Sequence, residues 1–474
     1  MSIHQNDGAS PLAAGTEGTL RLPAMVATAV GVVVVQSTMI SMLNGVGIGG
    51  INFLLAIGFS ALLALSYVLS FAELALMLPR AGSVSAYTEA ALGPALAIIA
   101  TLSGYVAVAL LGIPAELILV DTLLKQVVPG FTAVVPYPSF ILLGLFFALN
   151  LRGVDLFGRL QSVLVAIMFL GLFMIGAAGI ARAGGDSSTA AITLVGLDPS
   201  VAVSLVALAI WGLVGLEFVC PMIADAKDPV RHVPRSMMIG LVMIVLVYGL
   251  FCLAGLALLP VEKLDGATPH MDLALAVFGP TARLGFALLA ILGSATLLNT
   301  ILASVSRMIQ GMAESGQLPA ALARTNRFGV PVWALLALTL AIGVVRATLG
   351  MDASSILALT VAATGCWLVA YMIVHLDLVV LRLRLPDHHR PFRSPAFPLP
   401  QVLGILGMGY VFLNISPTPE LAGSIYRNVA MMLGVTLAYS LFWTVLVMRR
   451  NPFRADLPTA AITAGKPVAE AIEP

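Results

Sequence analysis

Long apolar runs, separated by short polar segments, make up most of the chain. A helix needs about 20 consecutive apolar residues to cross the hydrocarbon core of a bilayer. Twelve runs approach or exceed this length, at residues 22–46, 50–77, 94–124, 137–151, 158–181, 200–223, 236–259, 281–313, 331–349, 354–380, 400–416 and 427–448. The pattern predicts an all-α membrane protein with about twelve transmembrane helices, of which the fourth and eleventh are short.

The composition supports lipid as the solvent for these side chains. Hydrophobic residues make up 59% of the chain and charged residues 10%, whereas a soluble domain carries about 25% charged residues. We expect one transmembrane domain over residues 22–448, between cytoplasmic tails at 1–21 and 449–474. The net charge of +1 gives no reason to expect a nucleic-acid partner.

Lys and Arg residues are distributed unevenly between the two sides of the predicted bundle. An even number of spans places both termini on one side, and eighteen of the 24 basic residues fall on that side. Positively charged loops stay on the cytoplasmic side of a membrane. We therefore expect a multi-pass protein of the cytoplasmic (inner) membrane with both termini in the cytoplasm.

Two of the predicted spans are interrupted near their centres. Polar residues Gln36–Thr38 interrupt the first span, and the segment Trp211–Glu217 places two glycines and a carboxylate inside the sixth. Such residues can serve helix packing, but interruptions in corresponding spans of two halves indicate an inverted-repeat transporter with its site at the midplane. The first five spans (22–181) would then match the next five (200–380), followed by two further helices (400–448).

Ionisable side chains inside a membrane are costly and are functional candidates for that reason. Glu217 lies beside the interruption of the sixth span, where it either exchanges a proton during transport or bonds loop N–H groups as a structural carboxylate. Glu116, two residues after Pro114, either faces the cavity and pairs with a cationic substrate or is solvated near the surface. Asp121 and Lys125, four residues apart, predict a salt bridge at the end of the same span.

Six segments, in order along the chain, resemble motifs of the amino acid–polyamine–organocation superfamily of transporters. The similarity extends over nearly the whole membrane region. The matching segments are Leu69-Ser70-Phe71-Ala72-Glu73-Leu74 with Leu78-Pro79-Arg80-Ala81-Gly82-Ser83, Asn150-Leu151-Arg152-Gly153-Val154, Gly215-Leu216-Glu217, Lys227-Asp228-Pro229 with Val233-Pro234-Arg235, Ser306-Arg307 with Gly316-Gln317-Leu318-Pro319 and Pro331, and Arg390-Pro391-Phe392-Arg393.

The resemblance implies a LeuT-like fold, with a five-plus-five inverted repeat, two C-terminal helices and a substrate held by unwound parts of spans one and six. Where the family has G-S-G-I, this chain has Gln36-Ser37-Thr38-Met39, so two glycines are replaced by side chains with amide and hydroxyl groups. Met168 occupies the position of a lysine found in some members. The candidate substrate-binding residues are Gln36, Ser37, Thr38, Met39, Glu116, Trp211, Val214, Gly215 and Asn299, and Glu217 is the candidate for proton coupling or gating.

Secondary active transport of an amino acid, coupled to protons, is the function expected from these features. The exposed N–H groups of a half-helix suit a carboxylate and the freed carbonyls suit an ammonium, so a zwitterion satisfies both. Uptake or exchange of an organic amine or polyamine, such as putrescine, is the alternative, since both intramembrane carboxylates lack a nearby cation. A membrane enzyme is a more distant alternative, because the chain has no H-E-x-x-H or G-x-S-x-G motif. A non-transporting receptor is also distant, because no signalling domain is visible, and without a P-loop we expect no direct ATP drive. We expect no cofactor and no metal.

Overall fold

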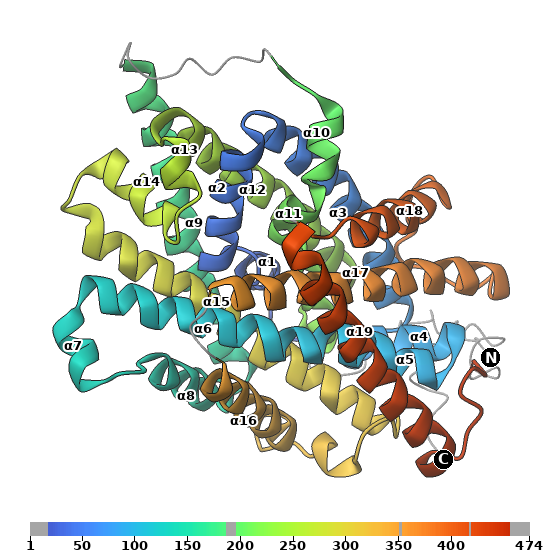
Figure 1. The fold of residues 1–474 in the computed structure, drawn as a ribbon. Coiled ribbons are helices and arrows are strands. Elements are labelled where there is room, and N and C mark those ends of the chain that lie inside the picture. Colours follow the sequence, from blue (N-terminus) through green and yellow to red (C-terminus); the bar gives the residue numbers. More distant parts are fainter. Residues whose placement is uncertain (1–17, 186–195, 350–352, 417–418, 456–474) are drawn as a thin grey trace, which may run out of the picture.

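The computed structural model describes residues 18–185, 196–349, 353–416 and 419–455, and within these ranges the chain is almost wholly helical (Figure 1). Eight helices are long and apolar enough to cross a membrane, and a bent pair supplies a ninth span. Three shorter apolar helices accompany them, at Ser139–Asn150, Val332–Thr348 and Leu399–Leu413. The all-α membrane fold is confirmed, and the number of spans agrees with the roughly twelve expected.

Ten helices and one π-helical segment form the first half of the bundle. In order they are α1 (Leu22–Gly31), α2 (Gln36–Gly49), α3 (Asn52–Met77), α4 (Val84–Leu92), α5 (Pro94–Thr101), η2 (Leu102–Val106), α6 (Ala107–Val127), α7 (Pro129–Val134), α8 (Ser139–Asn150), α9 (Val154–Gly185) and, after a gap, α10 (Pro199–Ser204).

The remaining elements run from the second broken span to the C-terminal helices. They are α11 (Val206–Ile210), η3 (Trp211–Leu213), η4 (Leu216–Asp225), α12 (Pro229–Leu258), α13 (Val261–Leu264), α14 (Pro269–Phe278), α15 (Ala282–Glu314), η5 (Ala320–Ala323), α16 (Val332–Thr348), α17 (Ala353–Arg384), α18 (Leu399–Leu413), α19 (Pro419–Phe442) and η6 (Trp443–Val447).

The first break lies four residues earlier than the polar segment that predicted it. Helices α1 and α2 meet at an angle of 58°, and the residues between them are Val32–Val35, the last with an extended backbone (φ −133°). Gln36–Thr38 instead form the first turn of α2. Consecutive β-branched residues are poor helix formers. Polar side chains at a helix start, in contrast, can accept hydrogen bonds from its unpaired N–H groups.

The second break lies between η3 and η4, where Val214 is extended and Gly215 has φ +107°. This backbone conformation strongly favours glycine. A Cβ atom built on Gly215 would also lie 2.7 Å from Cγ1 of Val32, in the first break. The two breaks therefore meet in the interior of the bundle.

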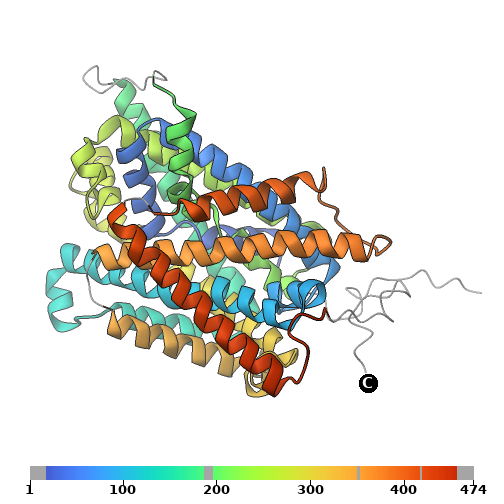
Figure 2. The same ribbon diagram turned by 45° about the vertical axis from the view of Figure 1, so that its right-hand side comes forward.

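The broken helices are surrounded by the rest of the bundle, whereas the last helices lie outside it. In the span Val206–Asp225, 83% of an apolar 18-residue window is buried inside the protein, against 22% in the span Leu421–Val447. Helix α1 packs against α9 and α12. Helices α18 and α19 both pack on α17 at the periphery, as Figures 1 and 2 show. Together with the two facing breaks, this is the LeuT-like arrangement that was expected.

One end of the two broken helices is fastened by main-chain hydrogen bonds. The Leu20 N–H donates to the Asp225 carbonyl over 2.9 Å, and the Lys227 N–H donates to the Leu20 carbonyl over 2.9 Å. Arg307 of α15 forms an ion pair with Asp225 over 3.1 Å. The start of α1 is thus held to the end of η4, which closes this side of the bundle.

Candidate functional site

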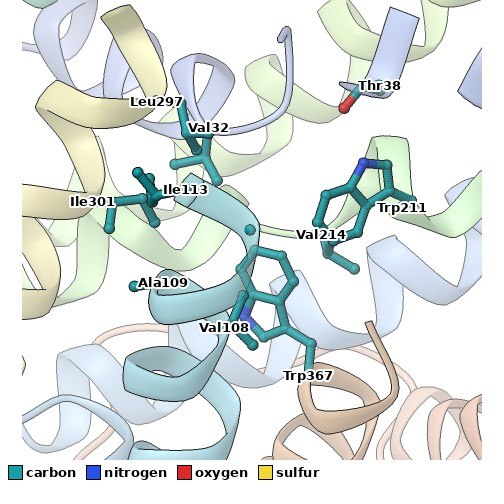
Figure 3. Close-up of a pocket in the computed structure, with 11 residues that line it drawn as sticks. Val32, Thr38, Val108, Ala109, Ile113, Trp211, Val214, Leu297, Ile301 and Trp367 are labelled. Carbon is teal, nitrogen blue, oxygen red and sulfur yellow. The ribbon is translucent and has the colours of Figure 1, made fainter. Parts of the chain in front are cut away.

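A small, mainly apolar cavity lies between the two breaks and helix α6 (Figure 3). Its volume is about 30 Å³, close to the space of one water molecule. A larger solute can enter only after the surrounding side chains or helices move. The lining residues are Val32, Thr38, Val108, Ala109, Gly112, Ile113, Trp211, Val214, Leu297, Ile301 and Trp367.

Two tryptophans form one wall of this cavity. The ring centroids of Trp211 and Trp367 are 6.0 Å apart, and Trp367 also packs edge-on against Phe218 at 5.9 Å. The indole nitrogen of Trp211 lies on the side of Thr38 in Figure 3. Within the described part of the chain, neither indole N–H has a hydrogen-bond acceptor. The cavity therefore has an aromatic wall, and the two buried indole N–H groups of that wall are unpaired donors.

Glu116 of α6 reaches across to the first turn of α2. The backbone N–H of Gln36 donates to Glu116 Oε1 over 2.9 Å, and that of Ser37 donates to Oε2 over 3.1 Å. The carboxyl group is buried. It thus lies on the positive end of a half-helix, where main-chain donors and the helix dipole favour negative charge. A buried role facing the broken helix, and not a solvated one, is what the structure shows for Glu116.

Two linked side-chain hydrogen bonds hold this carboxyl group in place. Gln36 Nε2 donates to Ser294 Oγ over 2.9 Å, and the Ser294 hydroxyl donates to Glu116 Oε1 over 2.7 Å. Both carboxyl oxygens accept hydrogen bonds, which is the pattern of an ionised carboxylate. Among the described residues, no basic side chain forms an ion pair with Glu116.

Glu217 lies in the first turn of η4, immediately after the second break, and is fully buried. The Tyr105 hydroxyl donates to its Oε1 over 3.2 Å. Its Oε2 has no hydrogen-bond partner within the described residues. A buried carboxyl group with an unpartnered oxygen and no paired cation is costly in its charged form.

Two stacked tyrosines form hydrogen bonds with the backbone of the second break. Tyr67 and Tyr371 lie with ring centroids 4.4 Å apart. The Tyr371 hydroxyl accepts from the Gly215 N–H over 3.1 Å. The Tyr67 hydroxyl donates to the Leu213 carbonyl over 2.7 Å and lies 3.4 Å from the Leu216 nitrogen as an acceptor. These hydroxyls replace helical hydrogen bonds that the break removes.

The structure gathers most of the expected site residues around the two breaks, in different roles. Thr38, Trp211 and Val214 line the cavity, while Gln36 and Ser37 hold Glu116. Gly215 forms the turn of the second break.

Two further candidates lie away from the cavity lining. Met39 is fully buried in α2. Asn299 accepts from Asn150 over 3.0 Å and donates to Gln161 over 2.8 Å, so it links α8, α9 and α15. Met168 is also buried, and a Cβ atom built on Gly293 would lie 2.7 Å from its sulfur.

The expected salt bridge between Asp121 and Lys125 is wrong. Asp121 instead pairs with Arg346 of α16 over 2.6 Å, and both side chains are buried. The backbone N–H and hydroxyl of Ser139 also donate to this carboxylate. Lys125 is exposed. Neighbouring charges on one helix gain little in water, whereas Asp121 faces the interior and needs a buried partner.

The sequence analysis did not single out Tyr67 or most of the cavity lining, and it made neither Trp367 nor Tyr371 a site candidate. Apolar side chains such as Val108 and Ile301 carry no pattern that separates a cavity wall from a helix contact. Within the described residues, no group of three His, Cys, Asp or Glu side chains converges on a position for a metal ion.

Comparison with known proteins places this arrangement among transporters. Residues 18–446 match the family model described as "Amino acid permease". The branched-chain amino acid permease BcaP of Bacillus subtilis is 24% identical over 443 residues, which cover 87% of this chain and 93% of BcaP. The family match begins before α1 and ends within η6, so it extends across the described membrane helices.

Two solved structures share the fold. Mhp1, a nucleobase-cation-symport-1 family transporter in a closed conformation with bromovinylhydantoin bound, superposes with a TM-score of 0.57 at 13% identity and covers 95% of this chain and 96% of its own. A Na⁺-coupled sialic acid symporter in a substrate-bound outward-open state gives 0.54 at 13% identity, with 84% and 90% covered. The chain belongs to the amino acid permease family, within the amino acid–polyamine–organocation superfamily.

Proposed function

We propose that this protein is a proton-coupled secondary transporter, not an enzyme, that carries a small solute with one amino group and an apolar body across the cytoplasmic membrane. Apolar amino acids are one class of such solutes. The observation that carries the proposal is the apolar cavity between two broken helices, at the place where both breaks meet.

The cavity lining supports a solute with an apolar body. Its polar side-chain groups are the Thr38 hydroxyl and the two indole N–H groups, and no charged side chain contributes. A polyamine such as putrescine would bring a second ammonium group into this apolar lining, which is costly. The relative BcaP is named for branched-chain amino acids, and a branched apolar side chain fits a wall of Val, Ile and Leu residues.

Glu217 supports coupling to protons. It is buried beside the second break, and its Oε2 lacks a partner. No basic side chain among the described residues pairs with it. When the helices move and water reaches the break, ionisation becomes favourable and the proton leaves. Proton binding and release are thereby tied to the side on which the site is open.

The direction of insertion follows from the basic residues. Eighteen of 24 lie on the side of both termini, and we propose that this side is cytoplasmic. The main-chain hydrogen bonds of Leu20 with Asp225 and Lys227, which we call the clamp, then close the cytoplasmic side in this conformation. Opening to the cytoplasm would require the start of α1 to separate from the end of η4.

Transport in proteoliposomes tests the proposal. Purified protein would be reconstituted in sodium-free buffer, and uptake of labelled leucine, valine, isoamylamine and putrescine measured with and without an inward proton gradient. We expect the gradient to drive accumulation of at least one of the first three solutes. Glu217→Gln should abolish gradient-driven accumulation while retaining exchange against preloaded solute.

Glu262→Gln is the matched control, because Glu262 is an exposed glutamate on the short helix α13. It should behave as the wild type. Absence of flux for every solute, under every gradient, would contradict transport and leave a receptor as the better interpretation. Flux that ignores the proton gradient would contradict the coupling alone.

A further inference from the structure

The position that a half-helix offers to an anionic ligand is already taken by the protein itself. Glu116 accepts the N–H groups of Gln36 and Ser37, the first two residues of α2. In transporters with broken helices, such N–H groups point at anionic groups of the substrate. Here the Glu116 carboxylate of α6 occupies the position that a substrate carboxylate would need.

Glu116 is held at this position by more than the two main-chain bonds. The Ser294 hydroxyl donates to it, and Gln36 in turn donates to Ser294, so α2, α6 and α15 are joined at one point. A substrate carboxylate could reach the two N–H groups only if this assembly came apart. The two buried oxygens of Glu116 would then lose three hydrogen-bond donors at once.

Glu116 lies at the edge of the cavity. It follows Ile113 by three residues and Gly112 by four on α6, and both line the cavity. Residues at these spacings share one face of a helix. Thr38, which also lines the cavity, directly follows Ser37. A charged group bound in the cavity would therefore lie within one helical turn of the Glu116 carboxylate.

The charge at this edge selects between two kinds of solute. A carboxylate in the cavity would face the like charge of Glu116, and the lining has no basic side chain to compensate it. The indole N–H groups of Trp211 and Trp367 carry no net charge and suit a neutral acceptor. An ammonium group would instead be attracted by the Glu116 carboxylate and by the indole faces.

We propose that Glu116 supplies the carboxylate that an amino acid would otherwise bring, so that the substrate is an apolar organic amine without a carboxylate. The proposal rests on the transport function proposed above and specifies its substrate class. Glu116 is then the residue that sets specificity for the amine.

The test compares two solutes that differ only in the carboxylate, isoamylamine and leucine. Wild-type protein in proteoliposomes should take up isoamylamine with a kcat/KM about tenfold or more above that for leucine. Unlabelled isoamylamine should also compete for its own uptake at about tenfold lower concentration than leucine does.

Two variants separate the charge of Glu116 from its shape. Glu116→Gln keeps the shape and removes the charge, and it should lose about tenfold or more of the preference for the amine. Glu116→Ala frees the Gln36 and Ser37 N–H groups, and it should shift the preference toward leucine. Glu262→Gln, the exposed control on α13, should retain the wild-type ratio.

The outcomes are distinct. Preferential uptake of leucine by wild-type protein would overturn the inference and leave the transport proposal intact. Wild-type protein that carries valine or putrescine but neither leucine nor isoamylamine would overturn the inference alone. Absence of flux for every solute would contradict the transport proposal, and the inference with it. The wild-type ratio decides the matter even where the two variants fold poorly, because it needs no substitution.

Discussion

Gly215 lies directly against Val32, because a Cβ atom built on the glycine would be 2.7 Å from the valine Cγ1. The contact joins the breaks of two spans that are five apart in sequence. Neither break can therefore change its backbone without displacing the other. In a transporter whose site lies between broken helices, a movement of one break would press on the other through this contact.

Gly215→Ala should destabilise the protein and reduce transport. The substitution adds a Cβ atom at φ +107° and pushes it into Val32, so we expect a loss of about 2 kcal/mol or more in the free energy of unfolding. Gly58→Ala is the matched control, since a Cβ atom there has no neighbour within 4 Å. Equal unfolding curves for the two variants in detergent would contradict the contact.

Tyr371→Phe should weaken the second break. The phenol oxygen accepts from the buried Gly215 N–H, and its removal leaves that donor unpaired at a cost of about 1 to 3 kcal/mol. The ring itself, and its stacking on Tyr67, would remain. Thermal unfolding in detergent measures the loss, and an unchanged midpoint would show that another acceptor replaces the hydroxyl.

Arg346→Met should be among the most damaging changes outside the site. It leaves the Asp121 carboxylate buried without its cation, which costs about 3 to 5 kcal/mol. The double variant Asp121→Asn with Arg346→Met removes both charges and should recover a large part of the loss. A double variant no more stable than the single one, in equilibrium unfolding, would argue against an isolated ion pair.

His270, on α14 between two membrane spans, should make stability depend on pH. Burial lowers its pKa from 6.5 to about 4, so the folded state holds the neutral ring. Its contribution is complete above pH 6.5 and is lost as pH falls toward 4. Over this window the unfolded chain binds the extra proton, and the free energy of unfolding should fall by about 3 kcal/mol.

His270→Phe provides the comparison for this effect. Phe keeps an aromatic ring against Phe286, which packs on His270 at 5.7 Å between centroids, and it does not titrate. The difference in the free energy of unfolding between about pH 7 and about pH 4.5 should therefore be smaller for the variant than for the wild type. Parallel pH curves for the two proteins would show that His270 is not the titrating group.

Asp225→Asn should loosen the clamp between α1 and η4. It weakens the ion pair with Arg307, which is partly exposed, so we expect only about a threefold increase in opening. With Cys252 and Cys366 replaced by Ala, labelling of the buried Cys220 of η4 by a maleimide reports opening. Glu314→Gln, on the same helix as Arg307, should leave the labelling rate unchanged.

The length and order of the apolar runs were enough to predict the bundle, because each span must satisfy its own backbone in lipid. The first break was displaced by four residues for a physical reason. Val32–Val35 are apolar and read as membrane helix, although their β-branched side chains favour an extended backbone. The second break was located correctly, since Gly215 is needed there for its positive φ.

The partners of buried charges could not be obtained from spacing along the chain. Asp121 pairs with Arg346, which is 225 residues away, and not with its neighbour on the helix. Glu116 bonds main-chain N–H groups of another helix, and such donors have no side-chain signature. Only the tertiary structure shows which face of α6 points toward α2.

The position of Glu116 also has an electrical consequence. If the proposed amine binds beside this carboxylate, the empty carrier has a negative charge inside the membrane and the bound ammonium group neutralises it. The membrane potential would then act mainly on the return of the empty carrier, by up to about 2.3 kcal/mol per charge for 100 mV. With the cytoplasm negative, that return is accelerated, so the resting voltage of the cell would help to drive each cycle of uptake.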